Sequence, residues 1–167
     1  MSLHLFFLYE FAGKVGHNLY FAFPDYNHSQ TPLGFEYRSF NITYPGTLQF
    51  TGNVAPSTGA LQITPDTSST LDRFQNKFGR VVYKTPFKLW EGDVNSIDGK
   101  IASFSTSFDV NIYRHINTTP GEGLAFIIVP DLDIPAQSNG QYLGLTNVST
   151  NGNWTKHLIA IELDTVK

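Results

Sequence analysis

The chain has no cysteine and little charge of either sign. Without cysteine, its 167 residues cannot form disulfides or thiolate metal sites. Only 15% of the residues are charged, the formal net charge is -3, and no run of lysine or arginine occurs. A basic patch is the electrostatic footprint of proteins that bind nucleic acid or anionic membranes. We therefore expect neither nucleic acid nor a membrane surface as a partner.

Long apolar runs, helical patterns and the signatures of common enzyme classes are also missing. The longest apolar run, at 124–129, is far too short to cross a bilayer. No stretch has the apolar period of a helix, and no internal repeat or low-complexity tract occurs. Gly-X-Ser-X-Gly, His-Glu-X-X-His and phosphate-binding loops are absent, and Gly121-X-Gly123 lacks the third glycine of a dinucleotide loop. The histidines are scattered, which favours structural or exposed roles: His4, His17, His28, His115 and His157.

Aromatic, hydroxyl and turn-forming residues are abundant. The chain has 14 Phe, 8 Tyr and 2 Trp among many Thr, Ser, Asn and Gly residues, a composition typical of β-sheets joined by turns. With 41% apolar residues, a chain of this length can bury one core. Five Asn-X-Ser/Thr sequons favour a secreted glycoprotein, with acceptors at Asn27, Asn41, Asn117, Asn147 and Asn153.

The N-terminal residues differ from the rest of the chain. Residues 1–8 are apolar but lack a basic region, and Glu10 follows soon after, so they match at best a clipped signal peptide. Up to residue 31 no regular period appears. We therefore expect a leader or extension at 1–31 and a single domain at 32–167.

Short strands are predicted throughout that domain. The clearest is 102–112, where apolar side chains alternate with Ser, Asp and Asn. Residues 124–129 are continuously apolar and predict a strand covered on both faces. Pro86 marks a break or an edge, and Asn151-Gly152 predicts a turn into the last strand. The predicted strands are 33–38, 47–51, 59–64, 78–90, 102–112, 124–129, 141–147 and 157–167.

The last predicted strand carries two carboxylates on one face. In a β-strand, Glu162 and Asp164 point the same way, roughly 6.6 to 6.8 Å apart. Their neighbours on both faces are apolar, which predicts an interior strand. Buried carboxylates are costly unless they are paired or bind a metal. Two interpretations stay open at this point: solvated acids on an edge strand, or an all-oxygen site for Ca²⁺ or Mn²⁺.

Three ordered segments carry a family resemblance: GEGLAFIIVP at 121–130, GQYLGLTN at 140–147 and IAIELDTVK at 159–167. With GALQITPD, GRVVYKTPFKLW and ASFSTSFDV upstream, the chain resembles the legume lectin (L-type lectin) domain, in the version found in plant lectin receptor-like kinases. The resemblance implies an all-β fold, an antiparallel jelly-roll β-sandwich of the concanavalin-like kind. It also implies a non-catalytic, extracellular domain that binds carbohydrate beside Ca²⁺ and Mn²⁺, and that can form homodimers.

The resemblance assigns metal ligands to the final segment. By the family pattern, Glu162 would ligate the transition metal, Asp164 would bridge both metals, and the carbonyl of Val166 would reach Ca²⁺. The remaining ligands and a sugar-stacking aromatic follow this segment in the family. We therefore expect a domain that is incomplete at the C-terminus, with weak or absent metal and glycan binding.

The resemblance also assigns the sugar contacts, with two departures from the family pattern. An Asp that accepts hydrogen bonds from sugar hydroxyls is replaced by Glu122, which is one methylene longer. A glycine that donates its backbone N–H is replaced by Gln141, with Gly140 one position earlier. Gln141 retains the backbone donor, and its side chain is expected to narrow the pocket.

Two other functions are compatible with the same sequence. The first is a non-catalytic ectodomain module that recognises peptide or protein partners. The second is a hydrolase like the family-16 glycosidases, because Glu162 and Asp164 match the first two acids of Glu-X-Asp-X-X-Glu. Lys167 stands at the third position, so the acid/base partner needed for retaining hydrolysis is missing.

Overall fold

The computed structural model describes residues 3–9, 13–22, 34–37, 39–40, 46–57, 59–64, 77–87, 89–92, 100–112, 121 and 123–165. These residues form strands, two short 3-10 helices and turns, and every strand pair among them is antiparallel. The strands are β1 (Leu3–Tyr9), β2 (Gly13–Ala22), β3 (Gly34–Tyr37), β4 (Leu48–Gly52), β5 (Ala55–Ser57), β6 (Ala60–Gln62), β7 (Gly79–Phe87), β8 (Trp90–Glu91), β9 (Lys100–Ile101), β10 (Ser103–Ile112), β11 (Gly123–Val129) and β12 (Ile159–Asp164).

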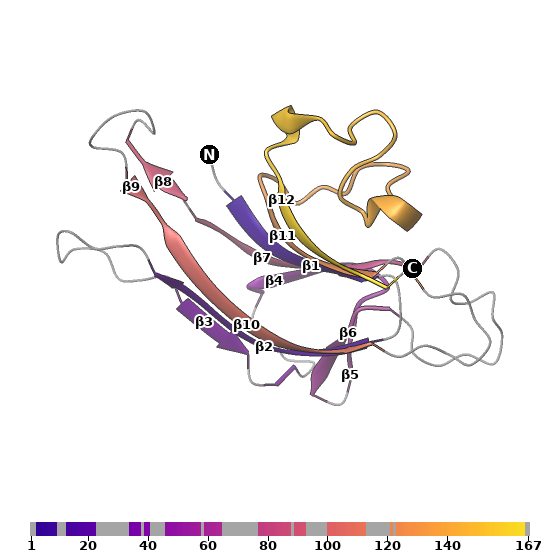
Figure 1. The fold of residues 1–167 in the computed structure, drawn as a ribbon. Helices are drawn as coiled ribbons and strands as arrows, with labels where there is room; N and C mark the ends of the chain where they lie inside the picture. The colour runs from indigo at the N-terminus through magenta and orange to yellow at the C-terminus, as the bar shows by residue number, and fades with distance from the viewer. Residues whose placement is uncertain are drawn as a thin grey trace.

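The strands build a sandwich of two sheets. The first, sheet A, has the order β12-β11-β1-β7-β4. The second, sheet B, has the order β10-β2-β6-β5, and β3 also pairs with β2. Figure 1 shows the two sheets as separate curved layers, with the β8–β9 ribbon at one end. The all-β antiparallel sandwich predicted from the sequence is confirmed.

Aromatic side chains join the two sheets. Phe126 of β11 stacks on Phe104 and Phe108 of β10, with ring centroids 6.1 Å apart in each pair. The strand β10 therefore turns its apolar face inward and its Ser and Asp face to solvent, as its alternating sequence predicts. Every residue of β11 is buried. The buried residues of this inter-sheet core are Phe40, Leu61, Ile63, Val81, Phe87, Leu124, Phe126 and Ile128.

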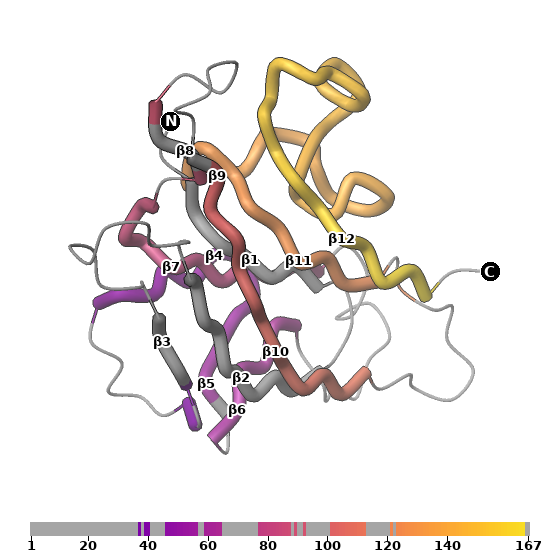
Figure 2. The backbone as a smooth tube through the Cα atoms, turned by 60° about the vertical axis from the view of Figure 1, so that its left-hand side comes forward, coloured from indigo at the N-terminus to yellow at the C-terminus, as the bar shows by residue number. Residues whose placement is uncertain are grey.

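A second apolar layer covers the other face of sheet A. Residues 130–158 form a long irregular segment that lies on the side of β11 and β12 away from β10 (Figures 1 and 2). Leu143 and its neighbours in this segment pack on the sheet, forming a cluster with Val82, Ala125, Ile127, Val129, Leu132, Leu145, Leu158 and Ala160. Because both faces of β11 are covered, its continuous apolar sequence is explained.

A buried arginine fastens the start of this segment to the sheet. Arg80 of β7 is 2% exposed, and its Nη1 donates to the carbonyl oxygen of Asp133 at 2.8 Å. Burial lowers the pKa of Arg80 to about 10, and the nearby Asp131 and Asp133 carboxylates act in the opposite direction. The guanidinium therefore stays charged at neutral pH.

The N-terminal residues take part in both sheets. The backbone of β1 pairs with β11 on one side and with β7 on the other, and β2 pairs with β10 along its whole length. The sequence shows no period here, yet the two strands sit in the middle of the sheets. That residues 1–31 form a leader or extension remains a prediction. No helix in the described part is long and apolar enough to span a membrane.

Two predicted elements are wrong. Residues 141–147 are not a strand: Gly140–Tyr142 is a 3-10 helix, η2, followed by turns, and Leu143 caps it with φ 48°. The last strand is not interior, because β12 pairs only with β11 among the described residues and lies at the edge of sheet A. Its inter-sheet face is exposed at Ile159 (47%), Ile161 (56%) and Leu163 (45%).

Candidate functional site

Pairing with β11 fixes the direction of the two carboxylates on β12. In the antiparallel register, Ala125 lies opposite Glu162 and Gly123 lies opposite Asp164. Directly opposed residues share a face, so both carboxylates point to the side covered by the 130–158 segment. Both side chains are exposed. The structure therefore places them on one face, as the sequence predicts, and at an edge in contact with solvent.

The end of β12 is held close to the start of β11. Thr165 Oγ1 donates a hydrogen bond to the carbonyl oxygen of Gly121, which is buried. Gly123 has φ 128°, and a Cβ at this position would lie 2.3 Å from the carbonyl oxygen of Leu163. Only glycine permits this close approach. The approach sets the position of Asp164 relative to Gly123 at the start of β11.

The covering segment is shaped by side-chain hydrogen bonds to its own backbone. Asn147 Oδ1 accepts from the backbone N–H groups and hydroxyls of Ser149 and Thr150. Asn153 Oδ1 accepts from Thr155 N at the start of the second 3-10 helix, η3 (Trp154–Lys156). Such Asn bonds replace regular backbone pairing in turns. They stabilise the turns of this stretch.

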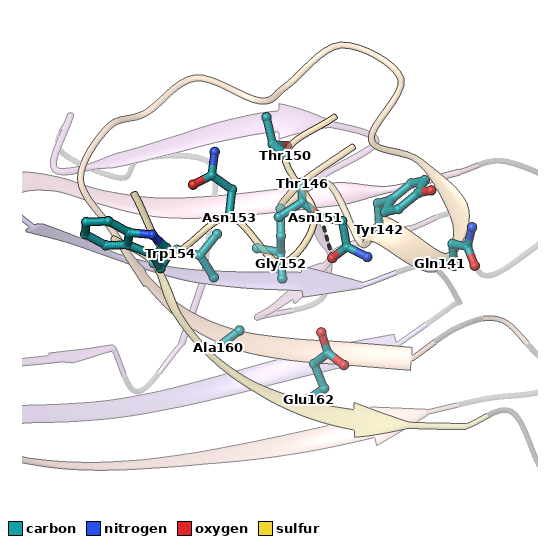
Figure 3. Close-up of a pocket in the computed structure, with 12 residues that line it drawn as sticks. Gln141, Tyr142, Thr146, Thr150, Asn151, Gly152, Asn153, Trp154, Ala160 and Glu162 are labelled. Carbon is teal, nitrogen blue, oxygen red and sulfur yellow. Dashed lines mark hydrogen bonds between the residues drawn. The ribbon is translucent and has the colours of Figure 1, made fainter. Parts of the chain in front are cut away.

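A pocket of about 260 Å³ lies between this segment and β12. Figure 3 shows Glu162 and Ala160 on one side of it, with Asn151 and Gly152 facing them and Trp154 and Tyr142 at opposite ends. Most of its polar groups are neutral amides and hydroxyls, and Glu162 is the single carboxylate among its lining residues. The lining residues are Gln141, Tyr142, Leu145, Thr146, Thr150, Asn151, Gly152, Asn153, Trp154, Leu158, Ala160 and Glu162.

The structure brings together some of the site residues predicted from the sequence. Gln141, from the predicted sugar contacts, and Glu162, from the predicted metal ligands, line the same pocket. Gly140 begins η2 beside it, and Asp164 lies further along β12. Several predicted residues lie outside the described part of the chain: Glu122, Val166, Asn27, Asn41 and Asn117.

The carboxylates match the chemistry of a hard cation, but they do not make up a full shell. Calcium takes about six to eight oxygen ligands, and Glu162 and Asp164 supply only part of that number. Across the described residues, no group of three or more His, Cys, Asp or Glu is placed to hold a metal. The donor type fits the implied metals.

Several pocket residues were not identified from the sequence. Trp154 is 82% exposed, and its ring meets that of His157 edge-on with centroids 6.3 Å apart. Tyr142 stands at the other end of the pocket. An exposed tryptophan is an amphipathic group that often marks a contact surface. Trp154 is the middle residue of the sequon Asn153-Trp154-Thr155. Because sequons lie on surface loops, this position is the sequence feature that could have predicted an exposed tryptophan.

Comparison with known proteins agrees with this architecture. The family model described as the legume lectin domain matches residues 32–167. A probable L-type lectin-domain containing receptor kinase S.5 of Arabidopsis thaliana is 37% identical over 137 residues, which is 81% of this chain and 20% of the relative. The receptor kinase IV.1 of the same plant is 34% identical over 142 residues, covering 84% of this chain and 19% of the relative.

A seed protein is a further relative. Seed leukoagglutinin of Maackia amurensis is 33% identical over 140 residues, which is 83% of this chain and 46% of that protein. The chain thus spans about a fifth of the length of the receptor kinases and less than half of the leukoagglutinin.

Proposed function

Because the chain belongs to the legume lectin domain family, we propose that it binds carbohydrate at the pocket between β12 and the 130–158 segment. The observation that carries this proposal is the meeting of Gln141 and Glu162 in one pocket lined by amides, hydroxyls and two aromatic rings. Neutral hydrogen-bonding groups beside aromatic rings suit an uncharged polyol, which offers hydroxyls along its edge and C–H groups on its faces.

We expect the sugar contacts of the family pattern here. The backbone N–H of Gln141 would donate to a sugar hydroxyl, and the carboxylate of Glu122, which lies outside the described residues, would accept from others. Gly140, with φ 66° and open space beside it, lets the chain turn just before this donor. The longer Glu122 and the Gln141 side chain shift the sugar relative to relatives that have Asp and Gly there.

A divalent cation would support this arrangement. Legume lectins typically bind calcium and manganese. Glu162, Asp164 and the carbonyl of Val166 would hold the ions here, and the bound ions would fix the loops that present donors to the sugar. With two carboxylates and one carbonyl oxygen as its ligands, such a site should have a calcium dissociation constant on the order of 10⁻⁴ to 10⁻³ M.

The relatives support an extracellular location. Receptor kinases carry this domain in the part of the chain that matches ours, and we propose that the protein is secreted or forms the ectodomain of a receptor. Sugar recognition without catalysis is the proposed role. A homodimer formed through sheet edges is compatible with this location.

A glycan array tests the proposal. The full chain made in bacteria, hence without glycans of its own, is applied with Ca²⁺ and Mn²⁺ and again with a chelator. We expect selective binding that the chelator weakens, and calcium affinity by calorimetry that falls about tenfold or more in Asp164→Asn, because Asp164 is the carboxylate assigned to both metals. Asp109→Asn, an exposed acid on the outer face of β10, is the matched control and should leave both unchanged.

Two results would each contradict one part of the proposal. Sub-micromolar calcium affinity would contradict the weak calcium site, because it would require more ligands than Glu162, Asp164 and the Val166 carbonyl supply. No glycan binding in any condition, with retained capture of a protein partner, would favour the peptide or protein module instead.

A further inference from the structure

Two sequons lie in the described part of the chain, and their asparagines have contrasting surroundings. Asn147 is half-buried, and its Oδ1 accepts four hydrogen bonds of 2.8 to 3.1 Å from Ser149 and Thr150. Its Nδ2 donates to the carbonyl oxygen of Ala136 at 3.1 Å. The Asn147 amide therefore uses its oxygen to hold the turn at 147–150 and its nitrogen to join this turn to the loop at Ala136.

Asn153 is exposed and uses only one end of its amide. Its Oδ1 accepts from Thr155 N at 3.0 Å and from Thr155 Oγ1 at 2.7 Å. No hydrogen bond joins its Nδ2 to another residue in the part of the chain that the structure describes. Figure 3 shows the amide pointing away from Ala160 and Glu162. Since Asn153 is exposed, the nitrogen that would carry a glycan is accessible, while the amide oxygen is held by Thr155 of the same sequon.

The residue after this asparagine is the exposed Trp154. Its 82% exposure leaves much of a large apolar ring in water, which is unfavourable. Aromatic rings combine well with groups that are apolar on one face and polar at the edge, and the first sugar of an N-linked glycan has this character. A glycan on Asn153 would be attached to the residue directly before Trp154, so its first sugar would start close to the ring.

We propose that Asn153 carries an N-linked glycan whose first sugars cover Trp154, and that Asn147 remains unmodified as a structural residue. The proposal rests on the secretory route proposed above. Because Trp154 also lines the proposed sugar pocket, the attached glycan would compete with an external sugar for this ring in the secreted protein. Glycosylation of Asn147 would replace one hydrogen of Nδ2, the atom that donates to the carbonyl oxygen of Ala136. A sugar on Asn153 displaces no hydrogen bond among the described residues.

Site-resolved mass spectrometry tests the first half of the proposal. The full chain is secreted from plant cells behind an added signal sequence, and enzymatic deglycosylation in heavy-oxygen water converts each occupied asparagine to labelled aspartate. We expect the label at Asn153, none at Asn147, and its loss in Asn153→Gln. An unlabelled Asn153, or equal labelling at both positions, overturns the assignment.

Thermal unfolding tests whether the glycan covers the ring. Secreted protein should melt at a higher temperature than the same protein after complete deglycosylation, and Trp154→Ala, which keeps the sequon, should abolish this difference. An unchanged difference in Trp154→Ala overturns the packing. Because sugar binding is measured on bacterial protein that lacks glycans, failure of this proposal and failure of the proposed function are distinguishable.

Discussion

Replacing Gly123 by alanine should weaken the fold through two separate effects at the junction of β11 and β12. The residue has φ 128°, which side chains rarely adopt, and such backbone strain costs about 1 to 3 kcal/mol. The new Cβ would also lie 2.3 Å from the Leu163 carbonyl oxygen and 3.1 Å from the Asp164 Cα. Forcing backbone apart in this way costs a further 1 to 3 kcal/mol, roughly.

A second glycine separates the two effects. Gly152 has φ 73°, and no heavy atom lies within 4 Å of a Cβ built there. Gly152→Ala should therefore show only the conformational cost, about 1 to 2 kcal/mol. The two variants differ in whether the new methyl group meets another strand. Gly123→Ala is expected to lose about 2 to 6 kcal/mol in total.

Urea denaturation followed by circular dichroism measures both variants. The free energy of unfolding comes from the midpoint and slope of each transition. Since Gly123 lies opposite Asp164, its variant should also lower calcium affinity, whereas Gly152→Ala should not. If the two variants lose the same free energy, within about 0.5 kcal/mol, then β12 does not approach β11 as closely as described and the reasoning fails.

Two further predictions concern the fastening of sheet A. Arg80→Ala should cost about 3 to 5 kcal/mol, because it opens a cavity and leaves the Asp133 carbonyl without its donor; Lys84→Ala, exposed on the same strand, should cost less than about 0.5 kcal/mol. Since the folded pKa of Arg80 is lowered to about 10, the cost of burying its charge is constant at lower pH and is relieved only as pH rises through that value. The Arg80→Ala defect should therefore be constant from about pH 5 to 8, and a defect that varies across this range would contradict the assignment. Deleting residues 1–12 should remove β1 from between β11 and β7 and abolish cooperative unfolding in the same urea experiment, whereas an unchanged transition would show that β1 is dispensable.

The sequence predicts the strands whose side-chain pattern is decided by the sheets themselves. The alternation in β10 and the apolar run in β11 both reflect which faces are covered. Residues 141–147 misled the prediction because Leu143 and Leu145 do face an apolar layer, but they reach it from turns. The spacing of apolar residues indicates which side chains are buried. It does not show whether a strand or a series of turns places them there.

Only the part of the site that lies on a single strand, β12, was predictable from the sequence. Glu162 and Asp164 share a face because of the two-residue period of a strand. That β12 is an edge strand depends on which strands pair, and β1 takes the place on the far side of β11. The pocket could not be predicted, because a long turn-rich segment with no periodic pattern brings Tyr142 and Trp154 to opposite ends of the cavity beside Glu162.

The position of β1 has a consequence for how the chain is made. It is synthesised early, yet its partners are β7 and β11, so it has no place in sheet A until residues 79–87 and then 123–129 have followed. Pairing between distant segments is slow, and unpaired strands are prone to aggregate. During vectorial synthesis, sheet A would therefore close late, and a chaperone that shields residues 3–9 should raise the yield of folded protein.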